Sequence, residues 1–150
     1  MAVYSLDEIL RLIIEWEKKL LRYYTLMEKY LARERSKKTI EALKRQQIKT
    51  LVVLGKINIK DYKKTEYLKN VPDSHSVEVI VPLEISKDSQ PQEIFEKILN
   101  YEEKLEEYYQ HIRGVLAYAK SKELFDMLIQ FKLGQIKRIK SYMDSYDLVM

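Results

Sequence analysis

Apolar residues recur every three or four positions along four stretches of the chain, which is the pattern of amphipathic helices. We expect these helices at about residues 6–35, 37–55, 92–119 and 122–147. Ser36 and Ser121 stand where their hydroxyls could cap the second and fourth helices, and Gly55 stands where the second could end. The pattern therefore predicts an all-α protein.

The first and third helices carry the same residues in the same order. Residues 102–109 repeat residues 17–24, with Glu at the first position, Leu at the fourth and Tyr-Tyr at the last two, and the copies lie 85 positions apart. The register holds without a gap across both pairs of helices, which indicates one duplicated helical hairpin. Two copies are too few for a solenoid, so we expect the hairpins to pack together as one bundle.

Residues 56–91 form a connection far longer than the few residues that usually join two helices. β-branched residues at 77–81 favour an extended strand, and residues 61–69 could form a short helix. A crossover of this length can run along the whole bundle, from the end of the second helix to the start of a third helix parallel to it.

Composition excludes several classes of protein. The 150 residues suffice for one domain, residues 1–150, and the absence of cysteine excludes cysteine-bound zinc, iron–sulfur centres and a thiol nucleophile. Charges interrupt residues 1–12, unlike a signal peptide, and no apolar run approaches the roughly 20 residues that span a bilayer. We expect a cytoplasmic protein without membrane segments. His75 and His111 have no companion residues that would form a metal site or a catalytic triad.

The charge is uneven along the chain. Residues 1–75 carry 17 basic and 10 acidic side chains, whereas residues 76–150 carry 10 and 13. The basic excess lies mostly between Lys37 and Lys69 and would suit a nucleic-acid surface, although a solvated helical face is the commoner meaning of such a run.

Each apolar stripe contains one polar residue. These residues are Glu17, Gln47, Glu102 and Lys132, with Thr50 and Gln135 one turn further along the second and fourth helices. In a bundle of two hairpins the four would meet at one level, so we expect a polar layer inside the core.

The Glu seven residues before a Tyr on the first and third helices, together with the long crossover, resembles the ferritin-like family and within it the rubrerythrin-like four-helix proteins. The resemblance covers residues 6–147 and implies a ferritin-like four-helix bundle. The family's second and fourth helices carry Glu-x-x-His, and its carboxylate sites hold two iron or manganese ions for oxidase, peroxidase or iron-storage chemistry. Here those positions are Gln47, Thr50, Lys132 and Gln135.

Of the six ligands that the resemblance implies, only Glu17 and Glu102 are present. Neutral amide and hydroxyl oxygens bind two hard dications weakly, and the Lys132 ammonium repels them. We therefore expect no metal and no cofactor. The ammonium would lie between the two carboxylates, and Gln47, Gln135, Tyr24 or Tyr109 would supply the remaining hydrogen bonds. Alternatively, Lys132 extends to water and leaves Glu17 and Glu102 free to bind one ion.

The leading hypothesis is a non-catalytic protein with an interaction or scaffold role. We expect a homodimer through the crossover and through aromatic surfaces. The aromatic side chains beside the stripes could line either the second hairpin or the subunit interface, and they are Trp16, Tyr23, Tyr30, Tyr101 and Tyr108. One alternative is an iron or manganese oxidase or peroxidase that uses Glu17 and Glu102. A second is a basic helical module that binds nucleic acid, which we regard as the less favoured partner.

Overall fold

The structure is a computed structural model that describes residues 4–31, 33–57, 67–68 and 90–149. Within these residues lie four long helices and two short strands: β1 (Tyr4–Ser5), α1 (Leu6–Tyr30), α2 (Glu34–Gly55), β2 (Tyr67–Leu68), α4 (Pro91–Val115) and α5 (Ala119–Val149). The prediction of an all-α four-helix bundle is confirmed. No described helix is long and apolar enough to cross a membrane.

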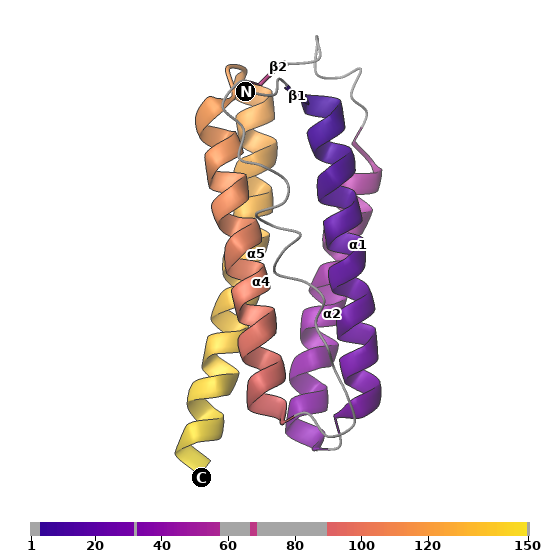
Figure 1. Ribbon diagram of the computed structural model, residues 1–150, viewed down its shortest axis with the longest axis vertical. Coiled ribbons are helices and arrows are strands. Elements are labelled where there is room, and N and C mark those ends of the chain that lie inside the picture. Colours follow the sequence, from indigo (N-terminus) through magenta and orange to yellow (C-terminus); the bar gives the residue numbers. More distant parts are fainter. Residues whose placement is uncertain (1–3, 32, 58–66, 69–89, 150) are drawn as a thin grey trace.

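The helices form two antiparallel hairpins that lie side by side (Figure 1). α1 and α2 make the first hairpin and α4 and α5 the second, and α2 runs in the same direction as α4 (Figure 1). The chain between Gly55 and Pro91 therefore joins opposite ends of the bundle, as expected for a crossover between two parallel helices. Ser36 Oγ of α2 lies 2.5 Å from Tyr142 Oη of α5, so these two helices also contact each other.

Local chemistry explains where the helices start. Ser5 caps α1, because its hydroxyl accepts a hydrogen bond of 3.2 Å from the backbone N–H of Glu8. Asp7 and Glu8 place negative charge in the first turn, where it interacts favourably with the helix dipole. α4 begins at Pro91, whose missing N–H costs nothing in a first turn.

Both hairpins turn in the same way. Leu31 ends α1 and Leu116 ends α4, each in an extended backbone conformation and each with a buried side chain. The first and third helices therefore stop at Tyr30 and Val115, several residues before the predicted ends at about 35 and 119.

The predicted caps of the second and fourth helices are wrong. α2 begins at Glu34 and α5 at Ala119, so Ser36 and Ser121 lie inside their helices, and both side chains are buried. Ser36 bonds Tyr142 instead of a helix terminus. A serine inside the bundle can satisfy its hydroxyl on a neighbouring helix, and the sequence pattern does not distinguish that role from capping.

Two residues of the long connection form an unexpected strand. Tyr67 and Leu68 pair antiparallel with Ser5 and Tyr4, so that part of the predicted helix at 61–69 is wrong. The rest of that segment and the predicted strand at 77–81 lie outside the described residues. The buried Leu68 fixes the connection against the start of α1.

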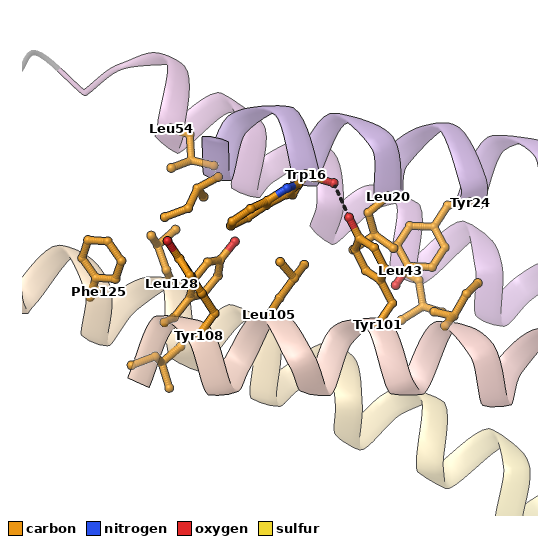
Figure 2. Close-up of a cluster of buried hydrophobic side chains, with 14 of the residues drawn as sticks. Trp16, Leu20, Tyr24, Leu43, Leu54, Tyr101, Leu105, Tyr108, Phe125 and Leu128 are labelled. Atoms are coloured by element: carbon orange, nitrogen blue, oxygen red, sulfur yellow. Dashed lines mark hydrogen bonds between the residues drawn. The ribbon is translucent and has the colours of Figure 1, made fainter. Parts of the chain in front are cut away.

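Aromatic side chains fill the contact between α1 and α4 (Figure 2). Trp16 packs edge-on against Tyr108, and Tyr23 packs edge-on against Tyr101. The Tyr101 hydroxyl also donates a hydrogen bond of 3.2 Å to the backbone oxygen of Trp16. Trp16, Tyr101 and Tyr108 are buried, so they join the two hairpins rather than forming an outer surface.

Replacing Leu20 by alanine should cost about 2–5 kcal/mol of unfolding free energy, because Leu20 is fully buried among these residues and truncation leaves a cavity. Ile48→Ala is the matched control. Its side chain is 44 % exposed, so the change should stay within about 0.5 kcal/mol. Urea unfolding of both variants measures the difference, and equal losses would contradict the packing described above.

Candidate functional site at the bundle centre

Lys132 lies between two carboxylates near the middle of the bundle. Its Nζ atom is 2.5 Å from Glu17 Oε1 and 3.1 Å from Glu102 Oε2. The three side chains come from α5, α1 and α4, and each is at most 1 % exposed. The ammonium therefore links three helices in a region that bulk water does not reach.

The apolar stripes bring these polar residues together. Glu17, Gln47, Glu102 and Lys132 each occupy a stripe position near the middle of their helix, and all four are fully buried. Because the stripes face the core, packing of the helices forces the four side chains to the same level. The polar layer predicted from the sequence is therefore present as a set of contacts.

Two further side chains hold the carboxylates. The Tyr24 hydroxyl donates a hydrogen bond of 2.7 Å to Glu102 Oε1. The Gln47 Nε2 group donates to Glu17 Oε1 at 3.1 Å and to the backbone oxygen of Glu17 at 2.8 Å. Each carboxylate thus receives Lys132 and one neutral donor, and α2 joins the network through Gln47.

Two of the other predicted members of the site are buried but bond elsewhere. Thr50 donates to the backbone oxygen of Gln46 at 3.0 Å, within its own helix. Gln135 donates to the backbone oxygen of Leu43 at 2.9 Å and so ties α5 to α2. The Tyr109 hydroxyl forms no well-aligned hydrogen bond with the described residues, but it lies beside Glu17: burial first, and then the charges of Glu17 and Glu102, raise the pKa of Tyr109. The residues brought together are therefore a subset of those that the sequence singled out.

Burial and charge act in opposite directions on Lys132. Burial alone lowers the pKa of the amine, but the charges of Glu102 and Glu17 outweigh it and raise the pKa above the ordinary 10.5. The ammonium form is therefore the one that the site holds at neutral pH. Burial raises the pKa of Glu102 above 4.5, although Lys132 acts to lower it, and Glu17 adds to the rise.

The network leaves some hydrogen-bonding capacity unused. Glu17 Oε2 and Gln47 Oε1 have no donor among the described residues, and Glu102 Oε2 receives the ion pair at 3.1 Å without the alignment of a hydrogen bond. Two carboxylates and one ammonium also leave one negative charge if both acids are ionised. A single proton shared within the site would remove that charge and supply a donor.

The donor set does not fit the two metal ions that the family resemblance implies. No cluster of three or more His, Cys, Asp or Glu side chains that could hold a metal ion occurs in the described part of the chain. The Lys132 ammonium contacts both carboxylates, which are the only two acids on the four equivalent positions. A dication there would face direct repulsion from a cation that the same carboxylates already bind.

The sequence did not reveal some of the contacts around the site. Tyr142 was not singled out, yet it bonds Ser36 and packs on Phe95, with ring centroids 4.2 Å apart. The sequence analysis also did not predict that the Tyr101 hydroxyl bonds the backbone of Trp16. The internal repeat contained a signal for this contact, because Trp16 and Tyr101 are 85 positions apart and so occupy corresponding places in the two hairpins. A bond between two side chains on distant helices has no such signature.

Comparison with known proteins gives one informative match. No protein-family model and no curated protein matches the sequence. The fold is similar to the crystal structure of a protein from Thermotoga maritima described as a ferritin-like diiron-carboxylate protein, with a TM-score of 0.71 and 16 % sequence identity. The match covers 96 % of this chain and 97 % of that chain, so it includes both hairpins. The chain therefore has a ferritin-like four-helix fold.

Proposed function

We propose that this protein is a metal-free, non-catalytic member of the ferritin-like fold with an interaction or scaffold role. The observation that carries the proposal is the Lys132 ammonium, which contacts Glu17 and Glu102 in the buried centre. The vestigial metal-site positions are then Glu17, Gln47, Thr50, Glu102, Lys132 and Gln135, and Tyr24 and Tyr109 are their neighbours. The tethered amine supplies the positive charge that the two acids need.

A covalently attached cation differs from a bound metal in ways that matter here. It needs no uptake from solution and cannot be removed by a chelator, so the bundle would fold in cells regardless of metal supply. It also offers no open coordination position at which oxygen or peroxide could react. Both properties suit a structural element and neither suits an oxidase.

The competing function is an iron or manganese oxidase or peroxidase that uses Glu17 and Glu102. It would require Lys132 to leave the two carboxylates, with which it forms an ion pair at 2.5 Å and 3.1 Å. The metal content of the purified protein separates the two proposals.

The register of the two hairpins supports further parts of the proposal. Glu17 and Glu102, Gln47 and Lys132, and the end residues Leu31 and Leu116 are each 85 positions apart and occupy corresponding places in the two hairpins. We infer that the hairpins arose by duplication and act as one domain. A cytoplasmic location and a homodimer remain predictions. Trp16, Tyr101 and Tyr108 are buried between the hairpins, so a dimer interface would not include them.

Metal analysis tests the central claim. Untagged protein, purified without chelators from cells supplied with iron and manganese, should contain far less than one metal ion per chain by inductively coupled plasma mass spectrometry. The variant Q47E/T50H/K132E/Q135H restores the implied ligand set and should bind two iron or manganese ions per chain. A control, Q47E/T50H/Q135H, keeps the ammonium and should bind much less.

Stoichiometric metal in the natural protein would support the oxidase or peroxidase instead. A folded four-residue variant that binds no metal would contradict the assignment of the α2 and α5 positions.

Removal of the ammonium alone should be costly. Lys132→Met leaves two facing carboxylates buried without a cation, and we expect a loss of about 3–5 kcal/mol in unfolding free energy. The triple variant E17Q/E102Q/K132M removes all three charges and should recover most of that loss. Urea unfolding measures both values. If the single variant is as stable as the natural chain, Lys132 does not balance the acids.

The raised pKa of Glu102 predicts a pH dependence. A carboxyl whose pKa is higher in the folded than in the unfolded chain stabilises the fold below the unfolded value and loses that contribution as the pH rises through the folded pKa. Glu102→Gln can still accept the bond from Tyr24 but cannot ionise. Relative to this variant, the natural chain should therefore lose stability as the pH rises above about 4.5. Urea unfolding at a series of pH values tests this, and an opposite slope would contradict it.

A further inference from the structure

The described charges separate across the bundle rather than only along the chain. α2 carries 6 basic and 2 acidic residues, whereas α4 carries 3 basic and 6 acidic residues. α2 contacts α5 through the bonds from Gln135 and Ser36, and α5 is also more basic than acidic. α4 packs on α1, and α1 carries equal numbers of basic and acidic residues. Lys132 of α5 is buried and paired, so the basic excess at the surface belongs to α2.

The strongest concentration is a row on the outer side of α2, which we call the basic stripe: Lys38, Arg45, Lys49 and Lys56. These residues follow one another at intervals of 7, 4 and 7 positions, so they share one helix face, and all are exposed. Arg45 and Lys49 lie two positions on either side of the buried Gln47, which places them on the opposite side of the helix. At about 1.5 Å per residue the stripe is about 27 Å long.

The stripe is poorly neutralised by the protein itself. Arg45, Lys49 and Lys56 have no ion pair among the described residues, and Lys38 forms an exposed ion pair of 3.6 Å with Glu34. The exposed Glu41 lies on the same face, four positions before Arg45, and has no ion pair among the described residues. In contrast, Arg11, Lys44 and Arg113 outside the stripe each pair with a nearby acid. The three unpaired cations on this rigid helix repel one another, and a polyanion would relieve that repulsion.

We propose that the basic stripe binds the phosphate backbone of a nucleic-acid duplex without reading its sequence. Four cations along about 27 Å match about eight base pairs of duplex axis, which is less than one helical turn, so a straight helix can follow the backbone. The exposed side chains beside the stripe are Glu41, Ile48 and Val52, which are not the paired donors and acceptors that read base edges. Affinity would therefore come from phosphate neutralisation and would fall steeply with salt.

Two other partners fit less well. A membrane surface favours large apolar anchors such as Trp, Phe or Leu beside the cations, whereas the exposed apolar side chains beside the stripe are Ile48 and Val52, 44 % and 49 % exposed. A second copy would have to present an acidic face, but the exposed Lys97 and Lys104 interrupt the acids of α4. The phosphates of a duplex carry no such interruption.

This inference gives the proposed interaction role a partner class but does not depend on the metal-free centre. The stripe faces away from Gln47, so the chemistry of the buried site does not enter the contact. Loss of duplex binding would leave the metal analysis unchanged, and discovery of bound metal would leave the stripe unchanged. The two proposals can therefore fail separately.

The test uses the full chain and a fluorescein-labelled DNA duplex of mixed sequence, with fluorescence anisotropy measured at several salt concentrations. Four phosphate contacts predict that log K falls with log salt with a slope of about −3.6. Arg45→Ala with Lys49→Ala should weaken binding at each salt concentration and reduce the magnitude of the slope by about 2. The matched control is Lys97→Ala with Lys104→Ala on α4, which removes the same charge and should change binding little.

Circular dichroism of each variant checks that the exposed substitutions leave the fold intact. Absence of duplex binding at low salt, or equal losses in the two double variants, would overturn the proposal. A parallel titration with phosphatidylserine vesicles provides the membrane arm. Vesicle binding that requires Arg45 and Lys49, without duplex binding, would also overturn it.

Discussion

The four helices can close around a polar centre because the Lys132 ammonium meets the carboxylates of Glu17 and Glu102 there. A buried carboxylate without a cation would have to take up a proton or keep the bundle open to water. A buried amine without acids would lose its charge. Each partner therefore makes the burial of the others possible, and Gln47 and Tyr24 fix the carboxylates in position.

Such a centre favours one arrangement of the helices more than it adds net stability. An apolar layer of the same volume could be at least as stable, since desolvation of three charges offsets most of their attraction. An apolar layer would, however, tolerate sliding or rotation of a helix by a turn. With three helices tied at one amine, a shift of α5 by one turn would separate Lys132 from both acids. The aromatic contact between α1 and α4 then packs in a register that the centre has already defined.

The helices and the buried polar residues could be predicted because both follow from periodicity. A polar residue on an apolar stripe has few places to go except into the core, and the copy 85 positions away repeated that signal. The ends of the helices were less predictable. Ser36 has the chemistry of a cap, yet its hydroxyl finds Tyr142 on α5, a residue 106 positions away. Nor could spacing alone show that Gln135 would bond the backbone of α2 while Gln47 bonds a carboxylate. Those choices depend on side-chain directions within the closed bundle.

The two hairpins carry different residues at one matched position, an amide at Gln47 and an amine at Lys132. If the first hairpin paired with a copy of itself, two glutamates would meet two amides, and no cation would balance them. The second hairpin paired with itself would bring two amines to two acids. Only the covalently joined arrangement gives one amine to two acids and one amide, so neither half of the chain reproduces this centre by itself. Joining the halves in one polypeptide ensures that the unequal pair forms each time the chain folds.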